Sequence, residues 1–141
     1  MIQIFIQFFE TLATAHTAYV PLIISCLLNE FVDITPVDNG KRTEVQFYVH
    51  WALQRVLEFV PTANTILVQL MRENFPHKSA DRREQISYVY NLIRISDYVQ
   101  HIRGDVLSLC IERVVKIDVA TLTLSISDEI GGNTIRTGSI R

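Results

Sequence analysis

The amino-acid sequence predicts an all-α protein, and a repeated dipeptide is the first observation behind this prediction. Tyr19-Val20 returns as Phe59-Val60 and again as Tyr98-Val99, at steps of 40 and 39 residues, and apolar stretches of helical spacing flank each copy. A second repeat, Val32-Asp33-Ile34 and Ile117-Asp118-Val119, spans about two such steps. Self-similarity near 40 residues with two helices per unit is typical of HEAT and armadillo repeats. We therefore expect a HEAT-like helical-repeat solenoid of about three antiparallel helix pairs, with the aromatic-valine dipeptide between the two helices of each pair.

The composition fits a protein with a buried core and few charges. The apolar fraction is 48% and the net charge is −2, whereas a domain that reads nucleic acid usually carries a clear basic excess. We therefore expect no direct sequence-specific binding to nucleic acid. Cys26 and Cys110 lie far apart in the chain, a usage that fits a reducing compartment and predicts neither a disulfide framework nor a zinc site.

The N-terminal segment is strongly apolar from Met1 to Phe9 and carries no charge from Thr11 to Asn29, which leaves three interpretations. A signal peptide needs a positive segment near its start, but the first basic residue is Lys41. A membrane span is longer and cleaner than a stretch that contains His16 and Pro21, with Glu10 and Glu30 at its ends. A buried helix pair is favoured over both, so no membrane association is expected.

This first pair is predicted from Ile2 to about Ala15 and from Tyr19 to about Phe31, where apolar residues recur at steps of three and four. Pro21 falls in the first turn of the second helix, where its missing N–H costs little. The stretch Ile34–Arg42, which contains Pro36, is predicted to be a loop.

The second pair is predicted from helix-capping and helix-breaking residues. Thr43 and Gln46 have the spacing of a capping box, which places the start of the third helix at Thr43. That helix should end just before Pro61, because the residue before a proline avoids the helical conformation. Thr62 or Asn64 is expected to cap the fourth helix.

The third pair follows the break at Asn74–Pro76. Ser79 is expected to cap the fifth helix, with Asp81 in its first turn, and the sixth helix begins near Ile102. The sixth helix has a strongly periodic apolar face, made of Val106, Leu107, Cys110, Ile111, Val114 and Val115. Without a further repeat to cover this face, we expect the chain to be marginally stable and prone to associate.

The remaining residues break the helical pattern. Thr121 to Ser127 alternates with a period of two, which suits a strand better than a helix, and Gly131-Gly132 follows. We interpret this stretch as disordered or as foreign to the repeats. The predicted organisation is a helical-repeat region at residues 1–119, part of a longer solenoid, and an irregular tail at residues 120–141.

The sequence shows no arrangement of residues that predicts catalysis. The four histidines, His16, His50, His77 and His101, fall on different predicted elements, and none has a second ligand-type residue three or four positions away on one helix face. Nucleophilic or metal chemistry needs such convergence. We therefore expect no enzyme activity, no metal and no cofactor.

One local group of residues, here called the basic cluster, could bind a partner. It consists of His77, Lys78, Ser79, Arg82 and Arg83. The simpler interpretation is a solvated helix start with a capping serine. The alternative is a basic contact for a partner, in which phosphorylation of Ser79 adds nearly two negative charges beside the arginines.

Two stretches of the chain resemble a known family, the TIF-IA family of RNA polymerase I-specific transcription initiation factors. They read FVPTANTILVQLMRENFPHKS and YVYNLIRISDYVQHIRGDVLSLCIERVVKIDV. The residues that match the family's internal helix motif are Tyr88, Asn91, Leu92, Ile93 and Arg94, and those that match its closing helix are Ile111, Glu112, Arg113, Val114, Val115, Ile117, Asp118 and Val119. The resemblance covers about Ile2 to Val119.

The resemblance implies a non-enzymatic bridge between RNA polymerase I and promoter-bound initiation factors at ribosomal RNA genes, in the nucleus and nucleolus. It also implies HEAT repeats and phosphoregulated serines on the polymerase-facing surface, which adds interest to Ser79. The family carries two acidic insertions. Here the first is reduced to Ile34–Arg42, and the second is replaced by the tail. The alternative function is a generic HEAT-repeat scaffold of another pathway, with the same helices and a different partner.

Overall fold

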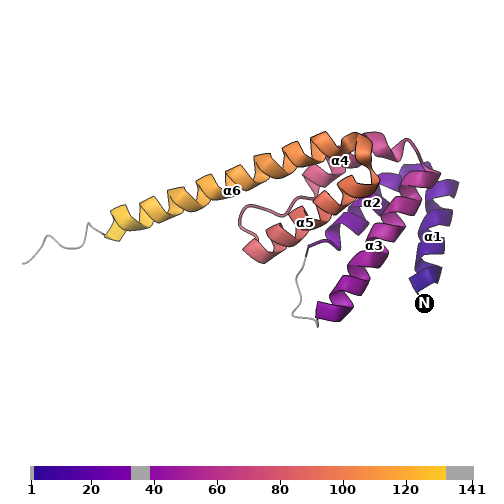
Figure 1. Cartoon of the computed structure of the whole chain (residues 1–141), viewed down its shortest axis with the longest axis horizontal. Coiled ribbons are helices and arrows are strands. Elements are labelled where there is room, and N and C mark those ends of the chain that lie inside the picture. Colours follow the sequence, from indigo (N-terminus) through magenta and orange to yellow (C-terminus); the bar gives the residue numbers. More distant parts are fainter. Residues whose placement is uncertain (1, 33–38, 133–141) are drawn as a thin grey trace, which may run out of the picture.

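The computed structural model describes residues 2–32 and 39–132, and these ranges are built from helices (Figure 1). The six α-helices are α1 (Ile2–Ala15), α2 (Val20–Asn29), α3 (Asn39–Phe59), α4 (Ala63–Glu73), α5 (Arg82–Tyr98) and α6 (Arg103–Gly132). Short 3-10 helices at Thr17–Tyr19 and Gln100–Ile102 precede α2 and α6. No strand occurs within the described ranges, and the predicted all-α class is confirmed.

The repeated aromatic-valine dipeptides lie where two consecutive helices meet. Tyr19-Val20 stands at the start of α2, Phe59-Val60 between α3 and α4, and Tyr98-Val99 at the end of α5. The three valines are at most 6% exposed, whereas Tyr19 and Phe59 are about half exposed. A small buried β-branched side chain thus anchors each turn in the core. The expected position of the dipeptide within each helix pair is confirmed.

Helices of one pair pack against helices of the next. α1 contacts α3, α2 contacts α4, and α4 contacts α6, while α6 runs back along α5 (Figure 1). Fully buried aliphatic side chains from α2 to α6 fill the space between them; these include Ile24, Leu28, Leu53, Val56, Leu67, Met71, Leu92, Ile95, Val106 and Leu109. Each such side chain stabilises the fold by about 1.5–3 kcal/mol before conformational entropy is subtracted.

Ion pairs connect the same helices on the outside of the core. Arg55 on α3 binds Glu10 on α1 (2.7 Å), and Arg72 on α4 binds Glu112 on α6 (2.8 Å). Lys116 also binds Glu112 (2.6 Å), and these two cations hold the pKa of the Glu112 carboxyl at about 2. Exposed ion pairs contribute little stability. The pair of Arg72 and Glu112 therefore acts mainly by favouring one register of α4 against α6.

A buried polar node joins α3 to α5. Nε2 of His50 donates to Oδ1 of Asn91 (3.0 Å), and the hydroxyl of Tyr98 donates to Nδ1 of His50 (2.9 Å). Asn91 in turn donates to the carbonyl oxygen of Ser87 (2.8 Å), and the ring of Phe31 stacks on the imidazole with centroids 4.6 Å apart. With the imidazole neutral, both ring nitrogens are used in these hydrogen bonds. Burial, the largest cause, lowers the pKa of His50 to about 4.

The start of α3 differs from the sequence prediction. The helix begins at Asn39, so the predicted loop is wrong for residues 39–42, and residues 33–38, which include Asp33 and Ile34 of the second repeat, lie outside the described ranges. Thr43 therefore lies inside α3 and opens no capping box. The amide of Gln46 instead donates to the hydroxyl of Ser87 on α5 (3.5 Å). A tertiary contact has replaced the local one.

The stretch from Thr121 to Ser127 also differs, because α6 continues without a break to Gly132. The far part of α6 extends beyond the other helices (Figure 1). A helix already nucleated gains one hydrogen bond for each residue added, while a strand needs a partner strand. Residues 133–141 lie outside the described ranges, and the division of the chain at residue 119 stays a prediction.

The apolar N-terminal segment forms α1 and α2, which meet at an angle of 116°. Within the described residues, no single helix is long and apolar enough to cross a membrane. Only α1 and α2 taken together, as a bent pair, are long and apolar enough, and this judgement rests on length and composition alone.

The polar node predicts a pH dependence of stability. Above pH 6.5 the imidazole of His50 is neutral in both the folded and the unfolded chain. Between pH 6.5 and 4 the unfolded chain binds a proton that the folded chain does not, so the free energy of unfolding falls as the pH falls. We expect His50 to account for a loss on the order of 1–2 kcal/mol between pH 7 and 5, measured by urea unfolding.

The variant His50→Gln should be less stable at pH 7, by about 1–3 kcal/mol, because Asn91 or Tyr98 loses a partner. Its stability should depend less on pH than that of the wild type. The matched control is His101→Gln, at an exposed position, which should leave both properties unchanged. Equal pH slopes for the wild type and His50→Gln would contradict the prediction.

Candidate functional site

The basic cluster is one continuous exposed surface at the start of α5. His77, Lys78 and Ser79 lie in the loop between α4 and α5, Arg82 and Arg83 lie in the first turn of α5, and all five are exposed. The structure thus brings together every residue that the sequence assigned to this site, because all five are near neighbours in the chain.

The cap of α5 differs from the prediction. Asp81 is the N-cap, and its Oδ1 accepts the backbone N–H of Arg83 (3.3 Å). Ser79 lies two residues earlier, and its hydroxyl is 2.7 Å from Nδ1 of His77. Ser79 therefore does not cap the helix. A carboxylate at the N-cap also interacts favourably with the helix dipole, which favours Asp81 over the serine.

Ser79 and His77 form a local turn. The backbone N–H of Ser79 donates to Nδ1 of His77 (3.2 Å), so this nitrogen is unprotonated and also accepts the hydroxyl of Ser79. A catalytic Ser–His pair needs a third group that orients the imidazole. In the part of the chain that the structure describes, no hydrogen bond is made by Nε2 of His77. The two hydrogen bonds between Ser79 and Nδ1 of His77 shape the loop before α5.

Gln85, whose role the sequence pattern does not reveal, holds the loop before α5 in place. Its side chain is buried, and Nε2 donates to the carbonyl oxygens of His77 (3.2 Å), Lys78 (3.3 Å) and Ala80 (3.3 Å). One amide group shared among three carbonyls holds the loop in a single shape. The only signal in the sequence is a polar residue beside the apolar face of α5, and that signal is too weak to identify the role.

The cationic side chains of the cluster are not used in the ion pairs of the fold. Arg55, Arg72 and Lys116 form ion pairs, whereas Lys78, Arg82 and Arg83 form none within residues 2–32 and 39–132. Two acidic residues, Asp81 and Glu84, are near in sequence, and Asp81 is occupied as the helix cap. The cluster therefore presents three cations to solvent.

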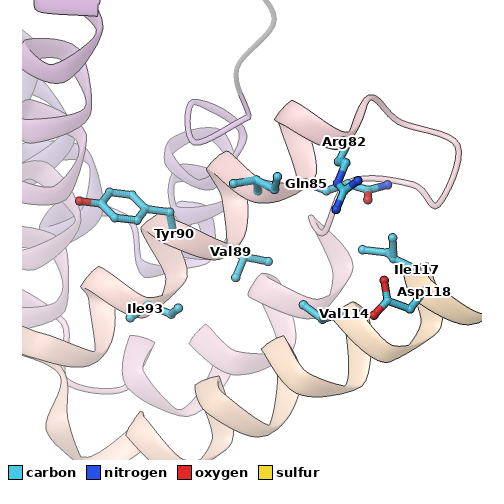
Figure 2. A pocket seen from close by; sticks show the side chains of 9 residues that line it. Arg82, Gln85, Val89, Tyr90, Ile93, Val114, Ile117 and Asp118 are labelled. Carbon is cyan, nitrogen blue, oxygen red and sulfur yellow. The ribbon is translucent and has the colours of Figure 1, made fainter.

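An apolar groove of about 330 Å³ lies next to the cluster, between α5 and α6. Its lining residues are Arg82, Gln85, Ile86, Val89, Tyr90, Ile93, Val114, Ile117 and Asp118. Figure 2 shows Arg82 at the end of the groove that also holds Asp118, with Ile93 toward the other end. The groove joins a charged end to an aliphatic floor, a combination suited to contact with another protein surface.

The histidines and cysteines do not gather elsewhere. His16 and His101 are exposed, His50 belongs to the buried node, and Cys26 and Cys110 are both free. Among the described residues, no three side chains of His, Cys, Asp or Glu are arranged to hold a metal ion.

Comparison with known proteins gives a consistent result. Residues 1–134 match the family described as RNA polymerase I specific transcription initiation factor RRN3. The RNA polymerase I-specific transcription initiation factor rrn3 of Schizosaccharomyces pombe is 31% identical over 118 residues, covering 84% of this chain and 19% of that protein. RRN3 of Mus musculus is 27% identical over 141 residues, covering 91% of this chain and 22% of that protein.

The fold is similar to that of a known crystal structure, that of RNA polymerase I transcription initiation factor Rrn3. The TM-score is 0.65 over 87% of this chain and 24% of that chain, with 23% identity. At this identity the similarity concerns the fold alone.

The match covers nearly all of this chain but only a small part of its relatives. The chain spans about a fifth of the length of the relatives that it matches. The family match continues past Val119, where the resemblance in the sequence was expected to end, to residue 134. Since it covers nearly the whole chain, the family is established: the chain belongs to the RNA polymerase I specific transcription initiation factor RRN3 family.

Proposed function

We propose that this chain acts in transcription initiation by RNA polymerase I, by binding the polymerase and helping to connect it to promoter-bound initiation factors at ribosomal RNA genes. Family membership is the observation that carries this proposal. The named relatives are RNA polymerase I-specific transcription initiation factors. This function corresponds to action in the nucleus and nucleolus. It also makes a generic scaffold of another pathway the weaker alternative.

We further propose that the helices form the start of a HEAT-like solenoid, which would present an extended binding surface. Three features support this architecture. The two helices of each pair are joined at equivalent aromatic-valine turns. The first helices of the first two pairs, α1 and α3, pack together, and the second helices, α2, α4 and α6, pack in series. A stack of repeats binds through one continuous surface made of many modest contacts.

The basic cluster is the proposed contact for the polymerase on this chain. Lys78, Arg82 and Arg83 have no ion pair among the described residues, and Gln85 holds their loop in one shape. A fixed loop loses little conformational entropy on binding. An acidic surface on the partner would complete the ion pairs and speed the encounter.

Ser79 is the proposed point of regulation within this contact. Its side chain is exposed, and it lies three and four residues before the two arginines. A phosphate adds about −1.5 to −2 charges. It would neutralise the nearby cations and remove their attraction to an acidic partner.

One prediction of this proposal concerns polymerase binding. The tagged chain should capture purified RNA polymerase I, and the double variant Arg82→Glu/Arg83→Glu should bind at least about tenfold more weakly, because like charges then face the acidic surface. Binding is measured by interferometry at two salt concentrations. The wild-type affinity should fall as salt rises, because salt screens exposed charges.

The matched control is Lys41→Glu/Arg103→Glu, which makes the same change in charge at exposed positions on α3 and α6. It should bind like the wild type. If neither the wild type nor either variant captures the polymerase, the proposed function fails. If both double variants weaken binding equally, the basic cluster is not the contact.

Another prediction of this proposal concerns Ser79. Ser79→Glu should weaken polymerase binding several-fold, whereas Ser79→Ala should bind like the wild type, since only the added charge opposes the contact. Ser108→Glu, at an exposed serine on α6, is the control for an added charge elsewhere. Equal weakening by Ser79→Ala and Ser79→Glu would indicate a loss of loop structure and would overturn the regulatory role.

A further inference from the structure

We propose that the outer side of the seam between α3 and α5 binds an acidic peptide segment of a partner protein. A carboxylate of the segment pairs with Arg94, and an apolar side chain packs against Phe47 and Tyr90. This inference goes beyond the proposed function and does not depend on it. The seam lies inside the row of helices, because α1 packs beside α3 and α6 packs beside α5.

Hydrogen bonds between polar side chains show which sides of α3 and α5 face each other. Gln46 bonds to Ser87 (3.5 Å), and His50, one turn later, bonds to Asn91 (3.0 Å). The partner on α5 advances by four positions when the residue on α3 does, so the two helices run parallel. The floor of the seam is therefore polar and already hydrogen-bonded.

Two aromatic side chains flank this polar floor on its outer side. At about 100° per residue, Phe47 and the buried Val49 lie on opposite sides of the seam on α3. On α5, Tyr90 and the buried Ile95 are separated in the same way. Phe47 is 58% exposed and Tyr90 is 60% exposed. Figure 2 shows the ring of Tyr90 pointing away from α6.

Arg94 supplies the charge of the proposed site. It follows Tyr90 by four residues on the outer side of α5, and it is half-buried. It lies close to the polar node, since its positive charge adds to burial, the largest cause, in lowering the pKa of His50. Within residues 2–32 and 39–132 it forms no ion pair and no hydrogen bond, although Asp97 is one turn away.

The chemistry of these groups selects an acidic peptide as the partner. A half-buried guanidinium attracts a carboxylate more strongly than an exposed one does, because less water and salt screen the pair. Arg83, seven residues before Tyr90 on the same side of α5, adds an exposed cation. Aromatic rings and arginine are the residue types enriched at the centres of protein interfaces.

A nucleic-acid strand matches the seam less well than an acidic peptide does. The outer side of α5 offers Arg83 and Arg94, and the net charge of the chain is −2. Binding to a phosphate backbone gains its affinity from many cations and usually needs a clear basic excess. One carboxylate and one apolar side chain, by contrast, are enough to use Arg94 and the two rings.

The experiment measures fluorescence polarisation of a labelled synthetic peptide, Glu-Asp-Asp-Phe-Glu-Glu-Leu-Asp, titrated with the whole chain. The wild type should bind it saturably, and added salt should weaken the binding. A peptide with Gln and Asn in place of Glu and Asp should bind at least about tenfold more weakly. A peptide with Ser in place of Phe and Leu should bind several-fold more weakly, since the rings then lose their contact.

Arg94→Gln should weaken binding of the acidic peptide at least about tenfold, because the charge-assisted hydrogen bond is lost. Tyr90→Ala should weaken it several-fold, and this variant tests the site without changing a half-buried residue. The matched controls are Arg82→Gln, which removes the same charge from the side of α5 that lines the groove, and Ile111→Ala, at a side chain on α6 that is 65% exposed. Both should bind like the wild type, and circular dichroism should show equal helix content in all variants.

Three results would overturn the proposal. The first is a wild type that does not bind the acidic peptide. The second is equal weakening by Arg94→Gln and Arg82→Gln, which would place the peptide on the basic cluster. The third is tighter binding of an oligothymidylate of similar charge, which would favour nucleic acid. Peptide binding without polymerase capture would refute the proposed function and leave this inference standing.

Discussion

The packing of each helix pair against its neighbour is the constraint on which the structure depends. An amphipathic pair cannot bury both of its sides by itself, and the middle pair, α3 and α4, is the one that contacts pairs on both sides. Aliphatic contacts alone allow one helix to slide along another at low cost. The node of His50, Asn91 and Tyr98 prevents this, because its hydrogen bonds form in a single register. A slip would leave buried polar groups without partners, at about 1–3 kcal/mol for each group.

Features of the fold that depend on neighbours in the sequence could be predicted. The apolar spacing of the helices and the turns at Val20, Val60 and Val99 are encoded within a few residues, and the structure agrees with them. The polar node could not be predicted, since the partners of His50 lie 41 and 48 residues away in the chain. The same reason explains the start of α3. Gln46 has the right spacing for a local cap but bonds to Ser87, on a helix that only the fold brings near.

The candidate site follows the same rule. The basic cluster was predicted as a unit because its residues occur within seven positions of the chain. The choice of Ser79 as the cap was wrong because Asp81 competes for the same role two residues later and is the better acceptor at a helix start. The role of Gln85 and the groove between α5 and α6 could not be found from the sequence. Both depend on how the loop and the two helices are placed in space.

Arg82 belongs to the basic cluster and also lines the groove between α5 and α6. Anything that covers the groove draws water away from this guanidinium, and a charge buried without a partner costs several kcal/mol. Asp118 at the same end of the groove is then the available acidic partner in the described part of the chain. An acidic partner protein would satisfy Arg82 directly and could cover the aliphatic floor as well.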